Sequence, residues 1–237
     1  MKQGSVEGAS ATTVLALETS SRTYAVAVGD GETPLAQAAA RRDDPEFPEL
    51  GVLVDGALAR AGLAFSDIGT IGVDVGPGGL ASIRAAVAYA NGLAFSLGVE
   101  IFPVSSLELM AIAAQRAHRG PFLCLKTAHG GNVYAGLFVN GETAEMRHGP
   151  PCSVIPAIAR GLTRVCVAGP TEEEVPDLLP DVTVEDSGIE EADVAVLYCV
   201  TRATVADPGR LVPVASPINE ASRIFHEPAS SRHARRS

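Results

Sequence analysis

One stretch around a glycine-rich turn constrains the fold more than any other part of the chain. Residues 70–75 are apolar and rich in β-branched side chains, which is typical of a buried strand. The turn Gly76-Pro77-Gly78-Gly79 breaks this strand. A helix is predicted over Leu80–Leu97, ended by Gly98, and a further strand over Glu100–Val104. The pattern predicts one unit of an α/β fold.

The helix predicted over Leu80–Leu97 has almost no polar surface. Arg84 is its only charged residue, and a helix that is apolar all round is usually buried all round. One stripe, which includes Ile83 and Val87, is expected to pack on the chain's own sheet. A second stripe of small residues, which includes Ala88, needs either another helix of the same chain or a partner protein. The sequence leaves both interpretations open.

A second apolar helix is predicted just before this unit, because apolar residues recur at helical spacing over residues 50–61. We predict that the two helices form a surface that binds a partner subunit. The predicted partner-binding residues are Leu50, Leu53, Val54, Ala57, Leu80, Ile83, Arg84, Val87, Ala88 and Asn91.

Two loops have features of phosphate-binding sites. The glycine turn precedes a helix N-terminus, where backbone N–H groups bind phosphate in many proteins, but no lysine stands at P-loop spacing. The other loop follows the first predicted strand. The two loops could together bind ATP or ADP with Mg²⁺ at a subunit junction. Two alternatives stay open: the glycine turn could simply connect strand to helix, and the other loop could simply connect two strands of a hairpin. The candidate nucleotide or phosphate residues are Glu18, Thr19, Ser20, Gly76, Gly78 and Gly79.

Composition and spacing argue against several other functions. The net charge of −10 disfavours direct binding to nucleic acid, which depends on lysine and arginine. The four cysteines form no CxxC pair and the five histidines no HxxxH pair, so we predict no metal site and no disulfides. No nucleophile stands near a base at usable spacing, so we predict no catalytic residue. We also expect no membrane span, no signal peptide and a cytoplasmic location.

The chain divides into three parts by composition. An N-terminal subdomain is predicted over residues 12–118, beginning with an antiparallel meander of three strands. A smaller subdomain over residues 119–206 repeats strands followed by helices, and its last helix is predicted over residues 192–204. Residues 207–237 are rich in proline and end in a basic segment, which is typical of disordered coil.

Several segments together resemble the TsaB (YeaZ) family of tRNA threonylcarbamoyladenosine biosynthesis. The resemblance is strongest over residues 57–111, where the GPG turn, the NGLA segment and VSSLE match family motifs. The opening LALETSSRTYAVAV is similar to the family's LAIDTS hairpin, and HGGNVYAGLF to its DARRGEVYAALY segment. Residues 13–140 carry the resemblance, and the remainder matches poorly.

The resemblance implies an actin-like (ASKHA, ribonuclease H-like) fold with two related subdomains of mixed sheet flanked by helices. It also implies a non-catalytic subunit that forms a homodimer or pairs with a TsaD-like catalytic subunit, joined by a TsaE-like ATPase. Such a subunit supports threonylcarbamoyl transfer to adenosine 37 of tRNA and contacts tRNA only indirectly.

The chain departs from the family's pattern at several positions. Glu18 and Thr127 each replace an aspartate, and the residues after Gly78 replace a Ser-Phe-Thr-Gly sequence. The family's C-terminal motif is also missing. Two alternatives therefore stay open, a nucleotide-dependent transferase or phosphotransferase of the actin-like class, and a homodimeric paralogue without a tRNA role.

Overall fold

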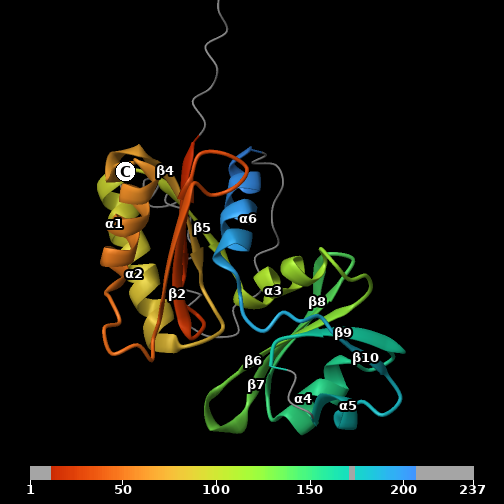
Figure 1. The fold of residues 1–237 in the computed structure, drawn as a ribbon. Helices are drawn as coiled ribbons and strands as arrows, with labels where there is room; N and C mark the ends of the chain where they lie inside the picture. The colour runs from red at the N-terminus through yellow and green to blue at the C-terminus, as the bar shows by residue number, and fades with distance from the viewer. Residues whose placement is uncertain (1–11, 171–173, 207–237) are drawn as a thin grey trace, which may run out of the picture.

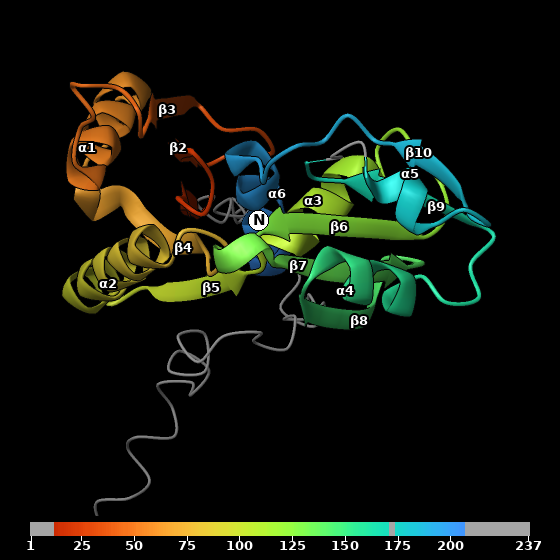
Figure 2. The ribbon, with the colours of Figure 1, turned by 90° about the horizontal axis from the view of Figure 1, so that it is seen from below.

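A computed structural model describes residues 12–170 and 174–206 of the chain. It contains two five-stranded mixed sheets with helices on their faces (Figure 1). Seen from below, the two sheets and their outer helices form two neighbouring layered units, with α3 and α6 between them (Figure 2). The predicted coil and basic tail over residues 207–237 lie outside the described residues.

The first sheet has the strand order β3-β2-β1-β4-β5. The three N-terminal strands form the predicted antiparallel meander, with Leu15 of β1 opposite Val28 of β2. β4 and β5 extend the sheet in parallel, and Ile71 of β4 lies opposite Leu15 on the other side. The strands are β1 (Thr13–Glu18), β2 (Thr23–Gly29), β3 (Ala36–Arg41), β4 (Ile68–Asp74) and β5 (Glu100–Val104).

The second sheet repeats this arrangement in the order β8-β7-β6-β9-β10. Its first three strands are antiparallel, and β9 and β10 are added in parallel. The repeated strand order confirms the actin-like fold of two related subdomains. The strands are β6 (Phe122–Thr127), β7 (Val133–Val139), β8 (Glu142–Gly149), β9 (Arg164–Ala168) and β10 (Thr183–Asp186).

The outer face of each sheet is covered by the helices that connect its strands. α1 and α2 cover the first sheet, and α4 and α5 cover the second (Figures 1 and 2). Two short 3-10 turns, η1 (Phe65–Asp67) and η2 (His129–Gly131), precede β4 and β7. The helices are α1 (Leu50–Ala61), α2 (Leu80–Leu97), α3 (Ser106–Ala114), α4 (Pro151–Ile158), α5 (Glu174–Leu178) and α6 (Val194–Ala206).

The remaining two helices lie between the sheets and cross from one half to the other. α3 follows the first sheet in sequence but packs on β6, β7 and β9. α6 follows the second sheet but packs on β1, β2 and β4. Gly72 of β4 allows this approach, because a Cβ atom there would collide with Thr201 of α6. The division at residues 12–118 and 119–206 stays a proposal, since each sheet takes one of its helices from across that boundary.

Three hydrophobic clusters follow from this layering. One fills the space between the first sheet and α1 and α2, and another lies between the second sheet and α4 and α5. The third contains residues of α3, α6 and both sheets. β1 is buried on both faces, because Leu15 and Leu17 join the first cluster while Val14 and Ala16 join the shared one. The sequence of a strand that is buried on both faces is typically a continuous apolar run, and β1 has such a sequence.

Two helix boundaries differ from the sequence-based prediction. The capping signal at Ser105 or Ser106 predicts a helix to about His118, but α3 ends at Ala114, where the chain tightens into turns. The last helix begins at Val194 because Asp193 accepts a hydrogen bond from the N–H of Ala195 at 2.6 Å, the usual action of an N-cap carboxylate.

Candidate functional site

The inner face of α2 belongs to the core of the first sheet. Ile83, Val87, Ala90 and Ala94 are all buried there, among residues of β1, β4 and α1. This is the aliphatic stripe that the sequence assigned to the chain's own sheet, and its burial confirms that assignment. The helix ends at Gly98, whose φ of 70° is in the left-handed region that glycine tolerates.

The outer face of α2 is exposed along its whole length. Phe95 is 91% exposed and Leu80 44% exposed. Between them runs the predicted stripe of small residues, none of which is covered by another described part of the chain. We call this set the outer face of α2, and it consists of Leu80, Ala81, Arg84, Ala85, Ala88, Asn91, Gly92 and Phe95.

The two helices carry most of the large apolar side chains that are exposed in the described residues. Four such side chains occur, and Val52 of α1 joins Leu80 and Phe95 of α2 among them. The fourth, Leu35, lies before β3. α1 and α2 are neighbours, since a Cβ atom at Gly51 of α1 would lie 3.6 Å from the ring of Tyr89. Apolar exposure is therefore concentrated on one side of the first half.

The predicted partner-binding residues divide into two groups. Four are exposed on α2, namely Leu80, Arg84, Ala88 and Asn91. The other six are core residues whose side chains face the first sheet and cannot contact another protein in this structure. Helical spacing alone did not separate the two faces. These buried residues are Leu50, Leu53, Val54, Ala57, Ile83 and Val87.

The expectation that no segment could span a membrane needs a correction at α2. By length and composition alone, α2 is long and apolar enough to cross a membrane. A core helix of a folded domain passes the same test. The inner face of α2 is part of such a core, so we attribute its apolar composition to packing.

A second group of residues joins the two halves of the molecule where β1 and β6 end. The Glu18 Oε1 atom accepts hydrogen bonds from the N–H of Ser20 at 2.8 Å and from its hydroxyl at 2.6 Å. The Lys126 ammonium, on β6 of the other sheet, donates to the hydroxyls of Ser20 at 2.7 Å and Ser21 at 3.2 Å. All four residues are buried.

Asp74, at the end of β4, completes this group from the side of the glycine turn. Its Oδ1 atom accepts a hydrogen bond from the N–H of Gly76 at 2.7 Å. The Ser106 hydroxyl, at the start of α3, is 2.7 Å from the same oxygen and 2.9 Å from Oδ2. We call Glu18, Ser20, Ser21, Asp74, Ser106 and Lys126 the junction cluster.

The electrostatics of the junction cluster are dominated by burial. Burial and the nearby Asp74 carboxylate raise the pKa of Glu18 to about 8, although the Lys126 charge and the Ser20 hydrogen bonds oppose the shift. Sequence reasoning missed Lys126, which lies far from Glu18 in the chain. The available signal was its rarity, since the chain has only two lysines and this one lies in a predicted strand.

The candidate phosphate residues lie together beside this cluster. Several of their hydrogen-bond donors are paired with acceptors of the chain itself. The N–H groups of Ser20 and Gly76 donate to carboxylates of the chain, and the N–H of Gly79 donates to the Ser20 carbonyl at 3.2 Å. The Thr19 hydroxyl donates to the Ser82 carbonyl at 3.2 Å. A Cβ atom at Gly78 would collide with the Ser20 carbonyl. Four donors of the two loops are therefore paired within the chain, and a phosphate site at these residues stays a prediction.

Glu108, in the first turn of α3, is a further buried carboxyl group. Its side chain is 7% exposed, and its Oε2 atom has no hydrogen-bond partner among the described residues. Burial raises the pKa of Glu108 to about 7, against the opposing hydrogen bond from the Ser105 backbone.

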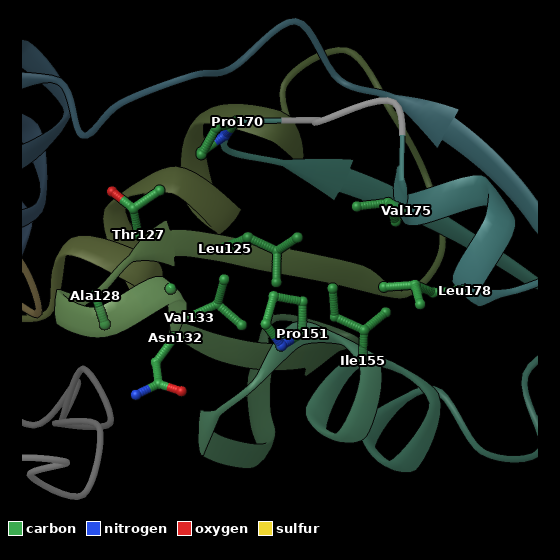
Figure 3. A pocket seen from close by; sticks show the side chains of 11 residues that line it. Leu125, Thr127, Ala128, Asn132, Val133, Pro151, Ile155, Pro170, Val175 and Leu178 are labelled. Atoms are coloured by element: carbon green, nitrogen blue, oxygen red, sulfur yellow. The ribbon is translucent and has the colours of Figure 1, made fainter.

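The second half contains a small cavity of about 130 Å³ that the sequence did not indicate (Figure 3). Its walls are mainly apolar, with Leu125 of β6, Val133 of β7 and Ile155 of α4 pointing into it. Thr127 and Asn132 are the polar side chains on its rim. Among the described residues that line it, none is charged.

Comparison with known proteins was made at three levels. The family model for TsaD, tRNA N6-adenosine threonylcarbamoyltransferase, matches residues 35–155, which is just over half of the chain. A tRNA N6-adenosine threonylcarbamoyltransferase of Moorella thermoacetica is 37% identical over 117 residues, covering 43% of this chain and 34% of that protein.

Two curated TsaB proteins match the same region. The protein of Haemophilus influenzae is 32% identical over 108 residues, covering 45% of each chain. That of Bacillus subtilis is 32% identical over 126 residues, covering 53% of this chain and 55% of the relative. The chain thus spans about a third to about half of the length of these three curated relatives.

Two solved structures from Pseudomonas aeruginosa share the fold. A protein with similarity to the peptidase YEAZ has a TM-score of 0.67 at 23% identity, covering 86% of this chain and 98% of that one. YeaZ itself has a TM-score of 0.63 at 22% identity, covering 84% and 94%. The matched motifs and the repeated sheet agree with these matches. The chain belongs to the TsaD family of tRNA N6-adenosine threonylcarbamoyltransferases and is a TsaB/YeaZ-type protein within it.

Proposed function

We propose that the chain is a non-catalytic subunit that supports threonylcarbamoyl transfer to adenosine 37 of tRNA. In this proposal it acts in the cytoplasm by binding a TsaD-like catalytic subunit through the outer face of α2. The kinship with TsaB and TsaD proteins supports the pathway, and the exposed apolar helix supports the mode of action.

The outer face of α2 is the observation that carries the proposal. A contiguous apolar patch on a folded protein is usually an interaction site. Phe95 is almost fully exposed and has no polar group, so water contact with its ring is unfavourable. Burial of such an aromatic side chain in a partner's pocket is typical of the residues that dominate binding energy.

The small residues of the outer face favour a helix as the contacting element. Ala81, Ala85, Ala88 and Gly92 leave a shallow surface along the helix axis. The distance between two packed helices falls as the side chains between them become smaller. With 18 residues, α2 offers a strip about 27 Å long, and α1 beside it adds Val52.

A supporting role agrees better with the junction cluster than does a nucleotide-dependent reaction. Glu18 and Asp74 are buried carboxylates that face a turn whose N–H groups are already bonded. Lys126 neutralises part of this charge from the opposite sheet. The chain also lacks an HxxxH pair, so we assign no catalytic metal to it. The net charge of −10 agrees with tRNA contact through other subunits.

The test is copurification of the chain with the TsaD-like protein of the same organism. Phe95→Asp and Ala88→Arg place a charge on the outer face of α2 at exposed positions, so each should leave the fold intact and abolish copurification. Leu35→Asp is the matched control, because Leu35 is 57% exposed but lies away from α2. Mass spectrometry of the modified nucleoside, in cells that lack their own TsaB, measures the functional consequence.

Four results are distinguishable. Loss of copurification and of the nucleoside with the α2 variants alone supports the proposal. Unchanged copurification with Phe95→Asp and Ala88→Arg overturns the assigned surface. A chain that forms a homodimer through α2, ignores the TsaD-like protein and fails to restore the nucleoside identifies a paralogue without a tRNA role. A rise in melting temperature with millimolar ATP and Mg²⁺ would restore the nucleotide-dependent alternative.

A further inference from the structure

Three side chains with metal-binding atoms meet at the edge of the second sheet, away from the junction cluster. They are His118, which follows α3, Cys166 of β9 and Glu185 of β10. One ligand atom from each lies within 4.8 Å of the others. Cys166 is buried, whereas His118 and Glu185 are half-buried, so the group is open to solvent on one side.

The backbone holds these three residues in place independently of any metal. Glu185 and Cys166 are paired in the parallel register of β10 and β9, which sets their side chains on the same face of the sheet. The N–H of Cys166 donates to the Pro121 carbonyl at 2.9 Å, which ties β9 to the loop after His118. The N–H of His118 donates to the Ala114 carbonyl at 3.0 Å and fixes its own position at the end of α3.

The chemistry of the three groups selects among metals. A thiolate and an imidazole are ligands that Zn²⁺ prefers, and a carboxylate oxygen is a common third ligand. Mg²⁺ and Ca²⁺ prefer oxygen ligands alone, so the sulfur and nitrogen atoms exclude them. We propose that His118, Cys166 and Glu185 bind one Zn²⁺, with the fourth coordination position open to solvent.

Sequence spacing did not reveal this group, because its members lie far apart in the chain and come from three different elements. CxxC and HxxxH pairs are local in sequence, so their absence says nothing about ligands from distant elements. Only the pairing of β9 with β10, and the return of the chain from α3 to β6, brings the three residues together.

Two features oppose metal binding and sharpen its test. The Arg164 guanidinium donates to Glu185 Oε1 at 2.6 Å, which occupies one carboxylate oxygen and places a positive charge nearby. This pair is well exposed to solvent, so it is expected to be weak. Burial also raises the pKa of the Cys166 thiol, so Zn²⁺ must displace its proton on binding.

The experiment is a zinc titration of the full chain, purified without a polyhistidine tag, in competition with a chromophoric chelator. The expected result is one tight site per chain. Cys166→Ser, His118→Ala and Glu185→Gln should each weaken it by more than about tenfold. Cys152→Ser and His148→Ala are the matched controls, since Cys152 is exposed and neither residue belongs to the group. Circular dichroism checks that every variant is folded.

Two further measurements separate this site from incidental binding. Co²⁺ in place of Zn²⁺ should give a thiolate-to-metal charge-transfer band that disappears in Cys166→Ser and persists in Cys152→Ser. Arg164→Gln frees Glu185 and removes a positive charge, so it should tighten zinc binding. The proposal is wrong if the chain takes up no stoichiometric zinc, or if its zinc affinity depends on Cys152 or His148 instead of the three proposed ligands.

Discussion

The two halves of the molecule share a strand order but differ in the helices that cover them. In the first half, α1 and α2 contain 12 and 18 residues, whereas the corresponding α4 and α5 contain 8 and 5. The inner face of α2 packs on its sheet, whereas its outer face leaves Phe95 exposed. The repeated sheet is thus the common scaffold, and the added helical surface of the first half is where a partner is expected.

The halves also differ in where their charged residues lie at the junction. The first half contributes two buried carboxyl groups, Asp74 and Glu18, and the pKa of Glu18 is raised to about 8. The second half contributes one buried ammonium group, Lys126. Neither set would be stable in isolation, because buried charges require compensation. The comparison therefore indicates that the two halves depend on each other at the junction while the outer helices are free to diverge.

Removal of the Lys126 charge, which links the two halves, should have the largest effect on the free energy of unfolding. Lys126→Met keeps about the length of the side chain but removes the buried hydrogen bonds to Ser20 and Ser21 and the cation near Glu18. The loss of a charged group from such a buried network is expected to cost about 3 to 5 kcal/mol. The loss should be larger at pH 8 than at pH 5, because a proton on Glu18 removes part of the unpaired charge. Urea denaturation at both pH values measures it.

The matched control for this prediction is the double variant Glu18→Gln with Lys126→Met. It removes the charges of both partners, so part of the lost stability should return. A decrease of less than about 1 kcal/mol for Lys126→Met at pH 8 would show that this lysine does not hold the halves together.

The two faces of α2 should respond very differently to truncation. Ile83→Ala on the inner face removes a buried aliphatic side chain and should lower the free energy of unfolding by about 3 kcal/mol. Phe95→Ala on the outer face should change it by no more than about 0.5 kcal/mol, because its ring contacts solvent. Chemical denaturation of the isolated chain compares the two. Equal losses would mean that the outer face is covered after all.

Ionisation of Glu108 should have a smaller, pH-dependent effect on the free energy of unfolding. Its folded value is raised from 4.5 to about 7, so the folded chain binds this proton more tightly. The resulting stabilisation is complete below pH 4.5 and is lost as the pH rises through 7. Glu108→Gln should therefore be more stable than the parent at pH 8, by about 3 kcal/mol at most. Glu18 titrates in both proteins, so the difference between their stability profiles isolates Glu108.

The smallest effect on stability is expected for a hydrogen bond of α6, one of the two helices that cross between the halves. The Tyr198 hydroxyl of α6 donates to the Gly31 carbonyl at 2.8 Å, so Tyr198→Phe should cost about 1 kcal/mol. Tyr134→Phe is the control, because the ring of Tyr134 packs against His148 and no hydrogen bond of its hydroxyl occurs within the described residues. Thermal unfolding followed by circular dichroism measures both variants. Equal effects would remove the role assigned to this hydrogen bond.

Much of the local structure could be predicted from the sequence, because it depends on periodicity and on turn residues. The run around the Gly76 turn specified a strand, a turn and a helix, and α2 has the predicted bounds. The aliphatic and small-residue stripes of that helix also correspond to its buried and exposed faces. The family could be identified from the same run, since its motifs lie within residues 57–111.

The sequence was a poor guide wherever function depends on contacts between distant residues. In α1 the apolar spacing of Leu53 and Ala57 predicted a face but not its direction, and both residues proved to be core. Lys126 meets Ser20 only because β6 and β1 end at the same junction. His118 joins Cys166 and Glu185 through the pairing of two strands.

The sequence by itself thus determined the strand, turn and helix around Gly76, the N-terminal meander and the two-sided character of α2. The tertiary structure alone decided which side faces the core, that α3 and α6 each pack on the other half's sheet, and which charges meet at the junction. The physical reason is one of range. Backbone preference and side-chain periodicity act over a few residues, whereas burial and charge pairing depend on which distant surfaces the folded chain brings into contact.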